Sequence, residues 1–199
     1  MARAGATSSK ARRRNEAAFG LLWHAAWILS IAATMAVLAF AGVPAVGPEM
    51  LALGAAAAAG LLGAVLSTQG RPGQMFAVLG WGLAGATACH LTGGVAGPLA
   101  AWCLAPAAAA TAFRGRETLA LGAAAAFAAA AVSTLDGLLL QLPHSSAVAA
   151  PWLGLVALVT VTLGFGAGLI GFQGDVGRDN RRKARADQVL EILDRQPLL

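Results

Sequence analysis

The sequence predicts an all-α, polytopic membrane protein built as a six-helix transmembrane bundle. Of its 199 residues, 58% are hydrophobic and 12% are charged, whereas soluble domains carry about 45–50% apolar and about 25% charged residues. Charged residues are sparse between positions 17 and 173 and concentrated at the two ends of the chain. The apolar stretches between them have the length, roughly 17–25 residues, that a helix needs to cross a bilayer.

Six apolar stretches follow one another along the chain. The first is longer than the apolar core of a cleaved signal peptide, about 7–15 residues, so we expect a membrane anchor there. The fourth is short and contains Pro106, so its limits are the least defined. Together they form a transmembrane domain over residues 17–173. The predicted spans are Ala18–Ala41, Glu49–Leu66, Gln74–Leu91, Pro98–Phe113, Thr118–Leu142 and Ala150–Phe172.

The two ends of the chain differ from the transmembrane domain. Residues 1–16 are polar and basic, and we expect them to be disordered. Residues 174–199 begin with a charged stretch and continue into a segment whose apolar residues Val189, Leu190 and Leu193 have helical spacing. This pattern predicts a C-terminal cytoplasmic signalling helix that continues the last span.

The distribution of positive charge predicts the topology. All 14 Lys and Arg residues fall in the two ends or in the second and fourth connections, which hold Arg71, Arg114 and Arg116. Positive residues stay on the cytoplasmic side, so both termini are expected there. The basic residues beside the spans favour the anionic surface of the lipid bilayer, and no nucleic-acid partner is predicted. The remaining connections are too short to fold as external domains.

Small and aromatic residues in the spans suggest how the helices pack. Gly164 and Gly168 form a GxxxG pair in the last span, which favours close helix contact. The pair fits packing within the bundle or contact between two copies, and it is expected to matter more than the glycines of the second span. Trp23, Trp102 and Trp152 lie near span ends, where tryptophan is expected as an interfacial anchor.

The sequence lacks the patterns that catalysis would require. It contains neither a GxSxG nucleophile motif nor a phosphate-binding loop, and its Cys and His residues lack structural zinc spacing. Cys89 and Cys103 fit buried packing thiols, although a disulfide is geometrically conceivable. Ionisable residues inside membranes suggest function, yet most here lie near the interface, so neither a metal nor a cofactor is predicted. These residues are His24, Glu49, His90, Asp136 and His144.

One connection is more specific than the others. The third and fourth spans are joined by a glycine-rich loop that runs from Thr92 to Pro98. A tight turn explains these residues without a ligand, because Gly93 and Gly94 permit positive φ and Pro98 suits the first turn of a helix. The alternative is a ligand-binding loop formed by Thr92, Gly93, Gly94, Gly97 and Pro98.

This loop, with Trp102 and Pro106 after it, resembles the TGGxxSP…W..LP pattern in the six-span sensory regions of bacterial sensor histidine kinases, closest to the DivJ type. A related GGxxNPF loop occurs in RegB-type redox kinases, where it is associated with quinone. Gly97 replaces the Ser or Asn of these patterns and Leu99 replaces the Phe, which argues against quinone sensing. The resemblance extends from Ala17 to about Leu199.

The resemblance implies a longer protein in the bacterial inner membrane. Beyond Leu199 it would carry a dimerisation domain and a kinase domain that uses ATP and Mg²⁺. As a homodimer it would phosphorylate a response regulator of a two-component system in cell-cycle control, and it could contact a membrane or periplasmic protein. None of the three histidines has the context of a phosphoacceptor, so this transferase chemistry lies outside these residues. The alternatives are a small transporter or channel subunit and a structural membrane anchor that recruits partners.

Overall fold

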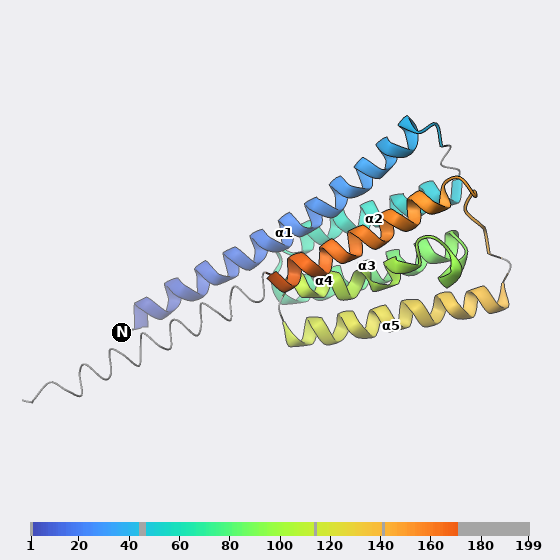
Figure 1. Ribbon diagram of the computed structural model, residues 1–199. Helices are drawn as coiled ribbons and strands as arrows, with labels where there is room; N and C mark the ends of the chain where they lie inside the picture. Colours follow the sequence, from blue (N-terminus) through green and yellow to red (C-terminus); the bar gives the residue numbers. More distant parts are fainter. Residues whose placement is uncertain (1, 44–46, 114, 141, 171–199) are drawn as a thin grey trace, which may run out of the picture.

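The computed structural model describes residues 2–43, 47–113, 115–140 and 142–170, with side chains from residue 17 onward. Every regular element in these ranges is helical, which confirms the all-α prediction (Figure 1). Two short 3₁₀ segments, η1 and η2, lie between α3 and α4. The elements are α1 (Ala2–Phe40), α2 (Gly47–Leu66), α3 (Gly70–Leu91), η1 (Gly94–Ala96), η2 (Ala100–Leu104), α4 (Ala105–Phe113), α5 (Arg116–Leu139) and a last helix, Ala150–Ile170.

The first helix is longer than expected. The backbone of residues 2–16 is helical and continuous with the apolar part of α1, whereas the sequence predicted a disordered segment. Its Ala, Arg, Lys and Glu residues are strong helix formers, and no proline separates them from the first span. The predicted signalling residues Val189, Leu190 and Leu193 lie outside the described residues.

Four helices are long and apolar enough to cross a membrane: Ala17–Phe40, Gly47–Leu66, Arg116–Leu139 and Ala150–Ile170. The third and fourth predicted spans, by contrast, do not meet this description. Helix α3 contains Gln74, His90 and several glycines, and it packs against α2, α4 and α5. Most of its small residues are buried against these neighbours, while large apolar side chains such as Phe76 and Leu83 are exposed on its outer side.

The fourth predicted span, Pro98–Phe113, is not one continuous α-helix. Residues 100–104 form η2, and the nine residues Ala105–Phe113 form α4. Pro106 lacks an N–H donor and suits the first turn of an α-helix, which explains why α4 starts at Ala105. The helix is almost wholly buried. Of the two predicted spans that depart from the expected pattern, the fourth therefore lies inside the bundle.

Contacts between connections define two ends of the bundle. At one, here called the Arg71 end, Arg71 forms an ion pair with Glu117, and Gly20 of α1 lies beside Ser67 and Phe113. At the other, here called the Thr92 end, His90 lies beside Asp136. The long helices run between these two ends, and the span of α1 begins at the same end at which the last helix finishes (Figure 1).

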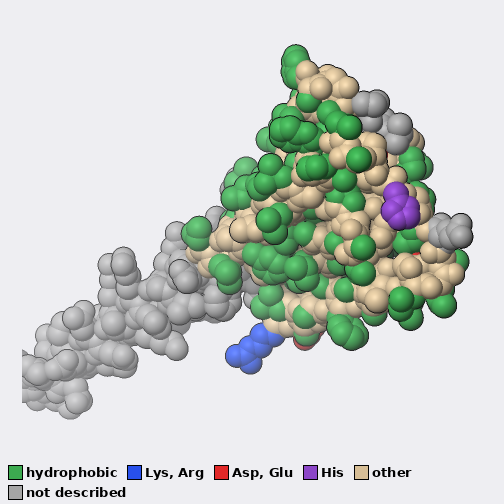
Figure 2. Space-filling view, turned by 45° about the vertical axis from the view of Figure 1, so that its right-hand side comes forward, with side chains coloured by type: hydrophobic (Ala, Val, Ile, Leu, Met, Phe, Trp, Pro, Cys, Tyr) green, Lys and Arg blue, Asp and Glu red, His purple; other side chains and the backbone are tan. Residues whose placement is uncertain are grey.

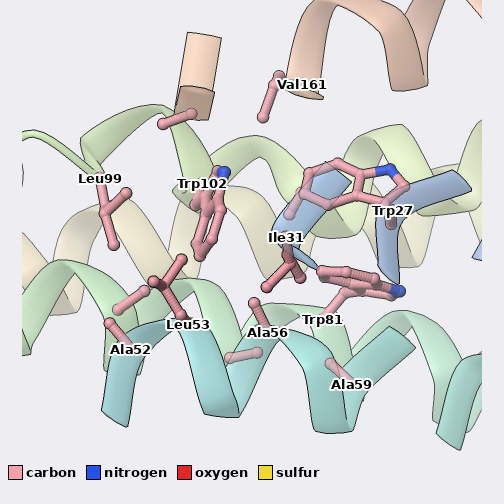
Figure 3. Close-up of a cluster of buried hydrophobic side chains, with 14 of the residues drawn as sticks. Trp27, Ile31, Ala52, Leu53, Ala56, Ala59, Trp81, Leu99, Trp102 and Val161 are labelled. Carbon is pink, nitrogen blue, oxygen red and sulfur yellow. The ribbon is translucent and has the colours of Figure 1, made fainter. Parts of the chain in front are cut away.

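Tryptophan side chains fill the centre of the bundle. Trp27 and Trp81 lie with their ring centroids 4.6 Å apart, and Trp102 packs on the same cluster (Figure 3). The prediction that Trp23 and Trp102 are interfacial anchors is wrong, because these side chains are 4% and 1% exposed. Small residues on the neighbouring helices leave room for large rings. Trp152 is 44% exposed and stays compatible with the anchor prediction.

The outer surface of the bundle is apolar. Large side chains such as Leu22, Leu62 and Phe127 are exposed on helices long enough to cross a bilayer. Figure 2 shows hydrophobic side chains spread over the visible face, with the basic side chains at one end. An exposed apolar surface of this extent is unusual for a soluble protein. It is the surface expected of a multi-pass membrane protein.

Candidate functional site

The loop from Thr92 to Pro98 is a tight, glycine-dependent turn at the Thr92 end. Gly93 and Gly94 have φ values of 107° and 70°, which favour glycine because a side chain is strained there. A Cβ at Gly97 would overlap the carbonyl group of Thr92. The prediction of positive φ is therefore confirmed. Pro98, however, lies in a turn two residues before η2 and does not open a helix.

This loop packs against the end of α5 and the connection that follows it. A Cβ at Gly94 would lie 3.0 Å from a methyl group of Leu142 and 3.0 Å from the carbonyl oxygen of Ser133. A hollow of about 530 Å³ opens here, lined by Gly93, Gly137, Leu140, Leu142, Pro143 and His144. Of the five residues predicted as a ligand-binding loop, Gly93 is the one that lines it.

The ionisable residues of this end pair with other protein groups. Nδ1 of His90 lies 3.0 Å from a carboxylate oxygen of Asp136, which joins α3 to α5. Glu49 is buried, and its carboxylate accepts a hydrogen bond of 3.0 Å from the backbone N–H of Ser146. Among the described residues, no three His, Cys, Asp or Glu side chains come together as a metal site would require. Each of these contacts joins two separate segments of the bundle, and the contacts do not gather the ionisable side chains around one common site.

The glycine pair of the last helix faces the interior of the bundle. A Cβ at Gly164 would lie 3.2 Å from the rings of both Trp23 and Trp27, and a Cβ at Gly168 would overlap the side chain of Thr111. Both glycines are buried. Their role is packing within the bundle, and the alternative of contact between two copies through this face is wrong.

Two buried tryptophans hold the last helix by hydrogen bonds that the sequence analysis did not anticipate. Nε1 of Trp23 donates to the carbonyl oxygen of Gly164 at 3.1 Å, and Nε1 of Trp102 donates to Oγ1 of Thr160 at 3.0 Å. Buried indole N–H groups usually find a partner. Thr160 is a polar residue within an apolar span, so the sequence offered a signal for one partner of such a bond. It did not show that the other partner would be Trp102.

His24 lies within the aromatic cluster. Its side chain is buried, Nδ1 donates to the carbonyl oxygen of Gly20 at 2.7 Å, and the ring packs against Trp23 and Phe113. A Cβ at Gly63 would overlap the imidazole. Nε2 has no hydrogen-bond partner among the described residues. Because Gly63 of α2 has no side chain, it leaves the space that the imidazole of His24 occupies.

The two cysteines lie together near the Thr92 end. Their Sγ atoms are 3.0 Å apart, and both thiols are free and buried. Cys89 belongs to the last turn of α3 and Cys103 to η2. The structure therefore agrees with the interpretation as buried packing thiols, and it brings the two sulfurs into contact without a disulfide between them.

A comparison with curated proteins shows what the chain is related to. It is 35% identical over 184 residues to the "Histidine protein kinase DivJ" of Caulobacter vibrioides. The chain is homologous to the N-terminal region of that kinase. The match covers 89% of this chain and 30% of DivJ. It confirms the resemblance to DivJ that the Thr92 loop predicted.

Two further comparisons gave no match. No family model matches the sequence, and no solved structure matches it. The relationship to DivJ therefore rests on sequence identity.

Proposed function

We propose that this chain is the membrane-embedded sensory region of a two-component sensor histidine kinase in a bacterial inner membrane. The identity with DivJ over 89% of the chain is the observation that carries the proposal. The kinase domain, with its ATP and Mg²⁺, would lie outside these 199 residues. By analogy with a cell-cycle kinase, the assembled protein would act as a homodimer and phosphorylate a response regulator.

The proposed topology has six spans and cytoplasmic termini. It is supported by the position of all 14 Lys and Arg residues, by the four helices long and apolar enough to span, and by α3 and the apolar segment Ala100–Phe113, which pack between them in the chain order that six spans require. The segment Ala100–Phe113 would cross with α4 buried inside the protein, and α3 would cross with Phe76 and Leu83 facing lipid. In this topology the Arg71 end faces the cytoplasm and the Thr92 end faces the periplasm.

The last helix is the proposed output element. It receives hydrogen bonds from Trp23 of α1 and Trp102 of η2, and its glycines fit against α1 and α4. A shift of the surrounding helices therefore acts directly on it. From there the change would pass to residues 174–199 and on to the kinase. The hollow beside Gly93, or a membrane or periplasmic protein bound at that end, is the proposed place of input.

The test is the autophosphorylation of the full-length protein in proteoliposomes with ATP and Mg²⁺, followed by phosphate transfer to a response regulator. Insertion of one residue after Lys183 would rotate a continuous helix by about 100°. We expect this insertion to change the rate of autophosphorylation by several fold while membrane insertion stays normal. An insertion of seven residues, which nearly restores the helical phase, is the matched control.

Two results would contradict parts of this proposal. Absence of any autophosphorylation in the correctly inserted full-length protein would remove the kinase assignment. Equal rates for the wild type and both insertions would show that the six helices act as a membrane anchor that recruits partners.

A further inference from the structure

The two thiols of the chain form an isolated pair. Cys89 and Cys103 are its only cysteines, and their Sγ atoms lie 3.0 Å apart. The side chains are 0% and 3% exposed. Each comes from a different element, α3 and η2, so a bond between them would join parts of the structure that are now held by packing.

The surroundings of the pair are small and mostly apolar. Ala86, Ala129 and Ala130 pack around the sulfurs, and Oγ of Ser133 lies 3.8 Å from Sγ of Cys103. Sγ of Cys89 also lies 3.4 Å from the carbonyl oxygen of Leu99. A folded oxidoreductase cannot reach sulfurs that are covered in this way. A small neutral molecule that dissolves in the membrane region can do so when neighbouring side chains move.

We propose that Cys89 and Cys103 are a reversible oxidation site that forms an intramolecular disulfide with hydrogen peroxide. In the first step one thiol gives up its proton and its sulfur attacks the peroxide; the O–O bond breaks, a sulfenic acid forms, and the departing hydroxide takes that proton and leaves as water. In the second step the other thiol gives up its proton and its sulfur attacks the sulfenic sulfur; the S–O bond breaks, the S–S bond forms, and the departing hydroxide leaves with that proton as a second water. Two thiols are thus oxidised by two electrons, and one peroxide is reduced to two waters.

The geometry favours the second step. The resolving sulfur is already in contact with its partner, and an S–S bond of about 2.05 Å needs an approach of only about 1 Å. The bond would enclose the loop from Thr92 to Pro98 and fasten η2 to α3. Trp102, which holds the last helix through Thr160, directly precedes Cys103 in η2. The oxidation site does not depend on the proposed kinase role.

The experiment uses the full chain in proteoliposomes treated with hydrogen peroxide. After denaturation, free thiols are alkylated with a maleimide, and the protein is cleaved with chymotrypsin, which separates the two cysteines after Leu91, Leu99 or Trp102. We expect loss of both alkylatable thiols, a linked pair of peptides that lacks two hydrogens, and full recovery of the thiols with dithiothreitol.

Single variants provide the matched control. In Cys89→Ser and Cys103→Ser the remaining thiol has no resolving partner, so a sulfenic acid should accumulate and be trapped by dimedone at least tenfold more than in the wild type. Both thiols remaining free in the wild type would overturn the proposal, as would disulfides between two copies or separate sulfinic acids. If a variant fails to fold, the presence or absence of the linked peptides in the wild type still decides whether the disulfide forms.

Discussion

The contrast between two glycines two residues apart shows how closely the last helix fits its neighbours. Gly168 leaves no room for a Cβ beside Thr111, whereas no atom lies within 4 Å of a Cβ at Gly166. Gly168→Ala should lower the free energy of unfolding by about 1–3 kcal/mol through overpacking. Gly166→Ala should be neutral or stabilising by up to about 1 kcal/mol through helix propensity.

Thermal unfolding of the two variants in the same detergent, followed by circular dichroism, checks this prediction. Equal midpoints would show that the glycine face is not closely packed. Gly60 and Gly63 are less suitable comparisons than the sequence indicated, because Ile28 and His24 crowd them.

The hydrogen bond from Trp102 to Thr160 can be isolated by a double-mutant cycle. Trp102→Phe keeps an aromatic ring but removes the indole N–H, and Thr160→Val keeps the shape but removes the hydroxyl. We expect a coupling energy of about 0.5–1.5 kcal/mol, the usual range for one hydrogen bond. The cycle is measured as the free energy of unfolding in mild detergent. Strictly additive single effects would mean that the bond contributes nothing to stability.

For single residues, the sequence predicted some backbone conformations correctly and misplaced some side chains. The positive φ values of Gly93 and Gly94 could be predicted, because glycine adopts this conformation without a steric penalty and two adjacent glycines in a short connection favour a tight turn. The direction in which Trp23 and Trp102 point depends on the rotation of their helices. That rotation is set by packing against helices far away in the chain, and no local pattern contains it.

At the scale of helices and connections, Glu49 joins the start of α2 to the start of the last helix. Its carboxylate accepts the N–H of Ser146, whose Oγ in turn accepts the N–H of Ala149. Glu49→Ala removes the acceptor, so amide hydrogen exchange at residues 146–150 should become at least tenfold faster. Glu49→Gln retains an oxygen acceptor and should show a smaller change.

The control for this variant lies at the other end of the bundle. Glu117 pairs with Arg71 at the surface, where its side chain is 64% exposed, and such pairs contribute little to stability. Glu117→Ala should therefore leave exchange at residues 146–150 unchanged. Equal acceleration by both alanine variants would indicate general loosening of the bundle and would contradict a specific role for Glu49.

The starts of three lipid-facing helices were predicted best. Helices α2 and α5 and the last helix begin within two residues of their expected positions, because their composition is fixed by contact with hydrocarbon. Helix α3 begins four residues before the expected Gln74, and α4 is shorter than expected. Both helices end where the sequence predicted, at Leu91 and Phe113, so only their starts were misplaced.

For the whole molecule, the topology is the most direct prediction. Reporter fusions after Arg71 and Arg116 should report the cytoplasm, and fusions after Gly97 and His144 should report the periplasm, because every Lys and Arg then lies on one side. Paired reporters, one active on each side of the membrane, measure this at each position. A periplasmic signal after Arg116 would show that α3 or the segment Ala100–Phe113 does not cross.

The tryptophan cluster also gives the molecule an optical property. Four of its five tryptophans lie in one network of ring contacts, from 4.6 Å between Trp27 and Trp81 to 6.2 Å between Trp27 and Trp102. Replacing the exposed Trp152 with phenylalanine would therefore leave an ultraviolet emission that comes from the interior alone. Since two of the emitting rings are hydrogen-bonded to the last helix, the wavelength and lifetime of that light would record its movement in the native chain, without any attached dye.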